Sequence, residues 1–228
     1  MGEILTRAIG GFQYSASIKE NGENGMNNVD RLCSNSLSIG VFARSYFNYL
    51  KQVLDSITPE SIDKLVKEFE NAREIGSTIF VAGNGGSATT ATSMANDIGF
   101  DIIKKCGTDK PFRVMALTDN TSVITAIAND VGYENIFLKQ LKIHYRQGDK
   151  LLAISASGNS PNVVSAAEWV KNQGGHVISF VGFTGGQLKE LSDVVVHVKS
   201  EAGEYGPVED AHLVLNHILA HWFQFKLR

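Results

Sequence analysis

The sequence has little cysteine, little net charge and no long apolar run, and each of these absences excludes a class of protein. Its two cysteines, Cys33 and Cys106, lie far apart with no metal-ligand or redox spacing around either, which favours a reducing cytoplasm over a disulfide scaffold. A formal charge of -3 argues against a nucleic-acid surface, which needs a basic stripe. No apolar run approaches the roughly 20 residues that span a bilayer, and no signal peptide is evident at the start. We therefore expect a cytoplasmic protein that binds neither nucleic acid nor membrane.

The remaining composition is that of an ordinary globular protein. The chain has 228 residues, of which 43% are hydrophobic and 20% charged, and this length suits one domain with a substantial core. Residues 1–40 are polar and glycine-rich with little periodicity, so we predict a flexible N-terminal arm there. A single domain is predicted over residues 41–228.

From residue 41 onward, helical and strand patterns alternate along the chain. Apolar residues recur at three- and four-residue steps in two segments before the first strand, which indicates two amphipathic helices. We expect strands at residues 79–82, 112–117, 150–154, 175–181 and 193–198, and helices at residues 41–57, 59–75, 88–98, 122–128, 136–144, 163–171 and 208–225. Such alternation of apolar strands with helices predicts an α/β fold, an open parallel sheet covered on both faces.

Two loops rich in glycine and serine follow predicted strands. The first, Gly83-Asn84-Gly85-Gly86-Ser87, lets the backbone turn sharply and ends at a suitable helix cap. The second runs from Ser155 to Ser160 and precedes Pro161, a residue type favoured at the first helical position. Hydroxyls, backbone N–H groups and a helix N-terminus suit an anion such as phosphate, whereas the motifs of nucleotide-binding loops are missing. Either loop alone could be a mere turn and cap, but two of them at one sheet edge favour a phosphate-bearing ligand.

Ionisable residues on two predicted helices are the catalytic candidates. Asp97 lies ten residues after the end of the first loop, on the helix that follows it. Glu209 and His217 share one face of the terminal helix at 100° per residue. His212 and His221 lie off that face, and we interpret both as capped or half-exposed structural residues. A histidine and a carboxylate beside a bound sugar phosphate would suffice for proton transfer between adjacent carbons, with a purely structural role for His217 as the alternative.

The chain resembles the SIS (sugar isomerase) domain family in its two loops and in two further segments, Thr125-Ala126-Ile127-Ala128-Asn129-Asp130 and Glu209-Asp210-Ala211-His212 with His217 beyond. Within that family the likeness is greatest to the phosphoheptose isomerases, and it covers most of residues 41–225. It implies a three-layer α/β sandwich with a parallel, flavodoxin-like sheet, to which this chain adds N-terminal helices. It also implies a homotetramer with sites shared between subunits and a phosphorylated sugar as substrate.

The resemblance also implies roles for individual residues. Asp97 and His217 match the pair that acts as acid and base in converting a ketose phosphate into an aldose phosphate through a cis-enediol. The substrate implied is sedoheptulose 7-phosphate, giving a D-glycero-heptose 7-phosphate for surface polysaccharide. The residues expected to bind it are Asn84, Gly85, Gly86, Ser87, Asn129, Asp130, Ser155, Ala156, Ser157, Ser160 and Glu209.

Four positions depart from the family pattern. The family carboxylate is normally glutamate rather than Asp97, and Ser93 replaces a histidine that helps bind zinc in the zinc-containing members. Glu209 replaces a glutamine, and Asp101 replaces an arginine. Because serine is a poor zinc ligand compared with imidazole, we expect no required cofactor, with zinc held by Asp97, Glu209 and His217 as the alternative.

Two other functions are compatible with the sequence. A non-catalytic SIS protein that binds a phosphosugar or another protein would keep the loops, but the retention of His217 favours the enzyme. An isomerase of a different sugar phosphate is the third interpretation, because Glu209 and Asp101 would alter the pocket.

Overall fold

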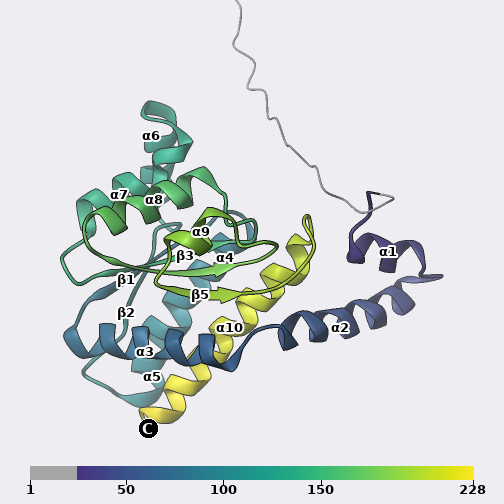
Figure 1. Cartoon of the computed structure of the whole chain (residues 1–228). Helices are drawn as coiled ribbons and strands as arrows, with labels where there is room; N and C mark the ends of the chain where they lie inside the picture. Colours follow the sequence, from purple (N-terminus) through teal and green to yellow (C-terminus); the bar gives the residue numbers. More distant parts are fainter. Residues whose placement is uncertain (1–24) are drawn as a thin grey trace, which may run out of the picture.

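The computed structural model describes residues 25–228, and its core is a five-stranded sheet (Figure 1). The strands lie in the order β2-β1-β3-β4-β5, and every neighbouring pair is parallel. In chain order they are β1 (Thr78–Ala82), β2 (Arg113–Ala116), β3 (Lys150–Ser155), β4 (His176–Val181) and β5 (Val194–His197). This order is that of flavodoxin-like sheets, which confirms the predicted fold class. Ligands of such sheets bind at the carboxyl ends of the strands, where both loops begin.

One face of the sheet carries the helices that bear the catalytic candidates. They are α3 (Pro59–Ile75), α4 (Gly86–Met94), the π-helical turn η1 (Ala95–Phe100), α5 (Asp101–Cys106) and α10 (Tyr205–Lys226). Phe223 of α10 packs against Phe69 of α3 and against Phe112, with ring centroids 6.0 and 4.4 Å apart. This apolar cluster anchors α10 beside η1 and the sheet.

The opposite face is covered by a second set of helices (Figure 1). They are α6 (Thr121–Asp130), the 3-10 turn η2 (Tyr133–Asn135), α7 (Ile136–His144), α8 (Pro161–Asn172) and α9 (Gly186–Leu191). Phe137, Val163 and Val170 are fully or almost fully buried against this face. The molecule is therefore a three-layer sandwich with helices on both sides of the sheet.

Two N-terminal helices, α1 (Asn28–Ser34) and α2 (Ile39–Asp55), extend from this sandwich (Figure 1). α1 lies inside the segment predicted to be a flexible arm, and a reciprocal pair of hydrogen bonds between Asn27 and Asp30 caps its start. Only Val53 of α2 is buried. The division of the chain at residue 40 stays a prediction, and most of the proposed arm, residues 1–24, lies outside the described residues.

Two helical segments differ most from the predicted ranges. The helix that follows the first loop does not end near residue 98 but continues through η1 into α5, which ends at Cys106 and is followed by Gly107 in the left-handed conformation. The terminal helix begins at Tyr205 rather than at residue 208. Within residues 25–228, no helix combines the length and the apolar character needed to cross a bilayer.

Candidate active site

The first loop connects β1 to α4 through glycines whose side-chain positions are occupied. A Cβ on Gly83 would lie 2.7 Å from the Ser87 Cβ and 3.0 Å from the Ile154 carbonyl oxygen, so this position requires glycine. Gly85 has φ +56°, and α4 begins at the next residue. A Cβ on Gly86 would lie 2.2 Å from a carboxylate oxygen of Glu209. The tight turn thus brings the start of α4 against the first turns of α10.

The Glu209 carboxylate lies at the N-terminus of α4, where the sequence predicts that a phosphate group binds. Burial and the neighbouring Asp210 charge raise the pKa of the Glu209 carboxyl, while the Gly86 backbone, against which it packs, lowers it. The raising effects win, so the pKa of Glu209 lies above its ordinary value. The Glu209 carboxyl therefore binds a proton more readily than the carboxyl of a surface glutamate.

The second loop brings three serine hydroxyls together. Ser155 Oγ lies 3.4 Å from Ser157 Oγ and 3.1 Å from Ser160 Oγ. The Gly158 N–H donates to Ser155 Oγ at 3.2 Å. Hydroxyls that lie this close can each donate to a shared anion when one binds.

An amide pair joins the two loops. Asn84 Nδ2 donates to Asn162 Oδ1 at 2.9 Å, and Asn162 Nδ2 donates back to Asn84 Oδ1 at 2.8 Å. The Tyr133 hydroxyl donates to the same Asn84 oxygen at 2.9 Å. Asn162 is buried at the start of α8. Since β1 and β3 are neighbours, this pair holds the loops at a fixed separation at the sheet edge.

A cavity of about 120 Å³ lies between the loops. It is lined by Asn84, Ser87, Ile154, Ser155, Ala156, Ser157, Ser160, Tyr205 and Glu209. The volume is below the roughly 300–1,000 Å³ of pockets that hold a whole drug-sized ligand, and it suits a single group such as a phosphate. Its described lining contains hydroxyls, the Asn84 amide and the Glu209 carboxylate, but no lysine or arginine.

The predicted catalytic pair meets where η1 packs against α10. His217 Nε2 lies 3.8 Å from Asp97 Oδ2, which is longer than a hydrogen bond. Asn216 Nδ2 donates to that same oxygen at 2.7 Å, and Asn96 Nδ2 donates to Asp97 Oδ1 at 2.9 Å. Two amides therefore hold the carboxylate, while the His217 side chain is 56% exposed. A π-helical turn under Asp97 agrees with the frequent occurrence of such turns at functional sites.

Two predicted substrate residues lie apart from this cavity. Asn129 and Asp130 are exposed at the end of α6, where Asn129 Nδ2 donates to Asp130 Oδ1 at 2.7 Å. Neither lines the cavity within one chain. From the same part of the chain it is Tyr133 that reaches the first loop.

The described residues provide no donor set for a metal ion. No group of three histidine, cysteine, aspartate or glutamate residues gathers anywhere in residues 25–228. Asp97 and His217 form a pair, but the Glu209 carboxylate is engaged at Gly86. Asp101 pairs with Lys105 at 2.9 Å. The arrangement does not fit zinc, so we derive no chemical step through a metal.

Our interpretation of His212 as a capped or half-exposed residue is wrong. The imidazole is fully buried and lies beside Phe180, with ring centroids 5.6 Å apart. Neither ring nitrogen has a hydrogen-bond partner that meets the usual geometry among residues 25–228. The nearby Val181 backbone favours the protonated ring, but its effect is smaller than that of burial. Burial lowers the pKa of His212 to about 4, so the ring is neutral at physiological pH. His221, by contrast, is exposed.

Sequence reasoning missed three residues that build the site. Asn162 follows Pro161 at the start of a helix, and Tyr205 precedes the predicted terminal helix, so neither carried a recognisable signal. Asn216 shares the predicted helix face of Glu209 and His217, and this shared face is the one sequence signal that indicates a role for it in the site. Each acts through a contact with a residue far away in sequence, which local patterns do not encode.

Comparison with known proteins agrees with this geometry. Residues 45–182 match the SIS domain family. The chain is 36% identical over 157 residues to the phosphoheptose isomerase of Aneurinibacillus thermoaerophilus, which covers 68% of this chain and 74% of that protein. It is 33% identical over 177 residues to the probable phosphoheptose isomerase of Thermoplasma acidophilum, with 78% and 94% covered. The solved structure of the phosphoheptose isomerase from Neisseria gonorrhoeae superposes with a TM-score of 0.71 at 28% identity, over 82% of this chain and 98% of that one. The chain therefore belongs to the SIS domain family and, within it, to the phosphoheptose isomerases.

Proposed function

We propose that this protein is an aldose–ketose isomerase that converts sedoheptulose 7-phosphate into a D-glycero-heptose 7-phosphate. The observation that carries the proposal is the arrangement of the serine-lined cavity and the Asp97–His217 pair along the same two packed segments, α4–η1 and α10. Glu209 at the cavity and His217 are eight residues apart, about 12 Å along a helix. An extended sugar phosphate keeps its phosphate and its carbonyl at opposite ends, so this spacing favours a long ketose phosphate over a short one.

The proposed reaction uses side chains of this chain alone. Asp97 takes a proton from C1 of the ketose and later returns it to C2, while His217 moves a proton between the two oxygens of the cis-enediol. The amides of Asn216 and Asn96 keep the Asp97 carboxylate oriented toward the sugar. The second loop and Asn84 hold the phosphate. Because the two groups are 3.8 Å apart and do not hydrogen-bond to each other, each can contact the substrate.

One experiment tests the proposal directly. The protein is incubated with sedoheptulose 7-phosphate in deuterated water, with chelator and with added zinc in parallel. We expect aldose product and deuterium at the carbon beside the carbonyl in the presence of chelator. Absence of both under every metal condition would refute the isomerase, and phosphosugar binding without turnover would instead support the non-catalytic alternative.

Two substitutions test the assigned roles. We expect Asp97→Asn and His217→Ala each to lower kcat by roughly 10²- to 10⁴-fold, the usual contribution of a positioned acid or base. His144→Ala changes an exposed histidine at the end of α7 and serves as the matched control. Unchanged turnover in His217→Ala would show that this histidine has no catalytic role.

We further propose a cytoplasmic homotetramer with sites at subunit interfaces. The exposed side of α10 carries an apolar surface of Ile218, Trp222 and Phe225 next to His217, with a groove of about 500 Å³. Exposed apolar patches of this kind mark interaction sites. A partner subunit on this surface would enclose His217, and the free thiols of Cys33 and Cys106 support a reducing compartment.

A further inference from the structure

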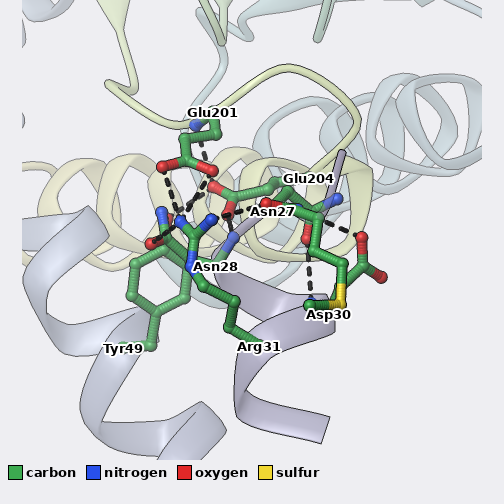
Figure 2. A network of polar contacts seen from close by, with 8 residues as sticks. Asn27, Asn28, Asp30, Arg31, Tyr49, Glu201 and Glu204 are labelled. Carbon is green, nitrogen blue, oxygen red and sulfur yellow. Dashed lines mark hydrogen bonds and ion pairs between the residues drawn. The ribbon is translucent and has the colours of Figure 1, made fainter. Parts of the chain in front are cut away.

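The loop before α10 holds a buried carboxylate with three hydrogen-bond donors (Figure 2). Glu204 is 1% exposed and forms no ion pair with any residue from 25 to 228. It accepts from the Asn28 backbone N–H at 2.8 Å, from the Tyr49 hydroxyl at 2.5 Å and from the Glu201 backbone N–H at 2.9 Å. A buried carboxylate is tolerated only when donors satisfy it. Glu204 therefore depends on α1, on α2 and on its own loop at the same time.

Further contacts attach the two N-terminal helices to this loop. Arg31 of α1 donates to both carboxylate oxygens of Glu201, at 2.8 and 2.9 Å (Figure 2). Asn28 Nδ2 donates to the Tyr49 hydroxyl at 3.0 Å, which links α1 to α2. Burial and the Glu204 hydrogen bond raise the pKa of Tyr49, so its phenol stays protonated and keeps donating. The loop is thus held from outside the sandwich by residues up to 176 positions away in sequence.

The residue next to Glu204 is part of the phosphate cavity. Tyr205 lines the cavity together with the serine loop, although its side chain remains 53% exposed at the rim. Its ring meets Phe183 edge-on, with centroids 5.2 Å apart. Phe183 has φ +48°, the one positive φ outside glycine in residues 25–228. Such strain in a bulky residue persists only where the surroundings enforce it, often at a functional site.

We propose that Tyr205 is a substrate-binding residue whose hydroxyl donates to a phosphate oxygen, and that Glu204 is the positioning residue that sets it through α1 and α2. The inference deepens the proposed function, since it takes the serine-lined cavity as the phosphate site. A cavity without lysine or arginine has to bind the anion through neutral donors, and a phenol at the rim supplies one. The backbone of Tyr205 follows directly from Glu204, so releasing that carboxylate moves the phenol.

The substitutions Tyr205→Phe and Glu204→Gln separate contact from positioning. The dissociation constant is measured by calorimetry with inorganic phosphate, and KM and kcat with sedoheptulose 7-phosphate. We expect Tyr205→Phe to weaken phosphate binding about tenfold, as the loss of a hydrogen bond to a charged group does, with kcat within about twofold. In Glu204→Gln the side-chain N–H₂ group faces one of the three donors and cannot accept from it. We therefore expect a loss of phosphate affinity similar to that of Tyr205→Phe, together with faster hydrogen exchange of the backbone amides 28–36. Glu168→Gln, an exposed change on α8, is the matched control and should alter nothing.

Coupling tests whether Glu204 acts through the N-terminal helices. Tyr49→Phe removes one donor to Glu204, and its effect on phosphate affinity should not add to that of Glu204→Gln. Unchanged phosphate affinity in Tyr205→Phe would refute the contact between the Tyr205 hydroxyl and the phosphate. Unchanged phosphate affinity in a folded Glu204→Gln would show that Glu204 has a structural role only. Because phosphate affinity needs no turnover, a protein that binds phosphate in this way without isomerising the sugar would refute the proposed function and leave this inference intact.

Discussion

At the scale of single residues, Glu209 places a carboxylate in the proposed phosphate site. Its carboxylate packs against Gly86 at the start of α4 and lines the same cavity as the serine hydroxyls. An ionised Glu209 therefore repels a phosphate group that enters beside it. Burial and Asp210 raise the pKa of Glu209, which reduces this repulsion as the pH falls.

Replacing this charge should tighten phosphate binding. We expect Glu209→Gln to lower the dissociation constant of inorganic phosphate about fivefold above pH 7, since two charges near 4 Å apart interact by about 1 kcal/mol in water. The difference from wild type should shrink as the pH drops and Glu209 takes up a proton. Calorimetry at several pH values compares the two proteins at each pH, which cancels the titration of phosphate itself. Weaker binding by the variant throughout would mean that the substrate needs the carboxylate.

The buried His212 makes folding stability depend on pH. The pKa of His212 in the folded chain is about 4, below the ordinary value near 6.5. Between these two pH values the unfolded chain binds a proton at His212 and the folded chain does not. The stability that the neutral His212 contributes is fully present above about pH 6.5, and it is lost progressively as the pH falls toward 4. Between pH 7 and pH 5 this loss amounts to about 2 kcal/mol.

An apolar residue at this position should remove that dependence. We expect His212→Leu to be near neutral or stabilising at pH 7, because two poorly satisfied ring nitrogens disappear. Its free energy of unfolding should fall about 2 kcal/mol less than that of wild type between pH 7 and pH 5. Denaturant titrations at both values measure this, with exposed His221→Gln as the control. Parallel losses in wild type and His212→Leu would contradict the neutral buried imidazole.

At the scale of elements, the second loop depends on the short helix α9. The Leu188 N–H of α9 donates to the Gly158 carbonyl oxygen at 3.0 Å. Gly158 has φ +67°, and a Cβ there would lie 1.8 Å from the Gly185 carbonyl oxygen. The sequence showed the glycine-rich exit of β4 but not the helix that it begins. The loop's hydroxyls are therefore held by a contact between two turns.

Two glycine substitutions measure that contact. Gly174 also has a positive φ, +71°, but a Cβ there meets nothing within 4 Å. We expect Gly174→Ala to cost about 1 kcal/mol from backbone strain alone. Gly158→Ala should cost at least about 3 kcal/mol, because backbone must shift, and it should weaken phosphate binding as well. Equal losses in the free energy of unfolding would show that the loop tolerates displacement by α9.

At the scale of the whole molecule, exposed apolar side chains lie on the outer side of α10 and on the segment that includes the start of α2. α10 exposes Trp222 and Phe225, and the segment from 37 to 47 exposes Leu37, Ile39 and Phe47. A chain of this size rarely leaves so much apolar surface to water without a partner. This distribution is what the proposed homotetramer would require if α10 and α2 contact other subunits.

A charge placed on the α10 surface should disrupt the proposed assembly. We expect Trp222→Glu to shift the mass measured by light scattering from a tetramer to a smaller species, with turnover falling in parallel because His217 lies beside Trp222. Glu168→Lys on the outer helix α8 is the control, and circular dichroism monitors folding. A tetramer that survives Trp222→Glu would place the interface elsewhere.

The sequence by itself determined the fold class and the position of the two loops that form the proposed phosphate site. Apolar runs and helical periods depend only on neighbours along the chain, and they predicted the five strands and most of the helices. The loops at Gly83–Ser87 and Ser155–Ser160 were predictable for the same reason, since a tight turn before a helix needs glycine and a cap locally. The likeness to a known family then assigned Asp97 and His217 to one site, and the structure brings them within 3.8 Å.

Only the tertiary structure decided which partner each polar group meets. Glu209 packs against Gly86, Asn162 joins the two loops, and His212 is buried instead of half-exposed. Glu204 accepts from Asn28 of α1, which lies in the predicted flexible arm, and from Tyr49 of the predicted helix α2. These outcomes depend on packing between segments distant in sequence, where burial sets the free energy of each polar group, and periodicity along the chain carries no record of that environment.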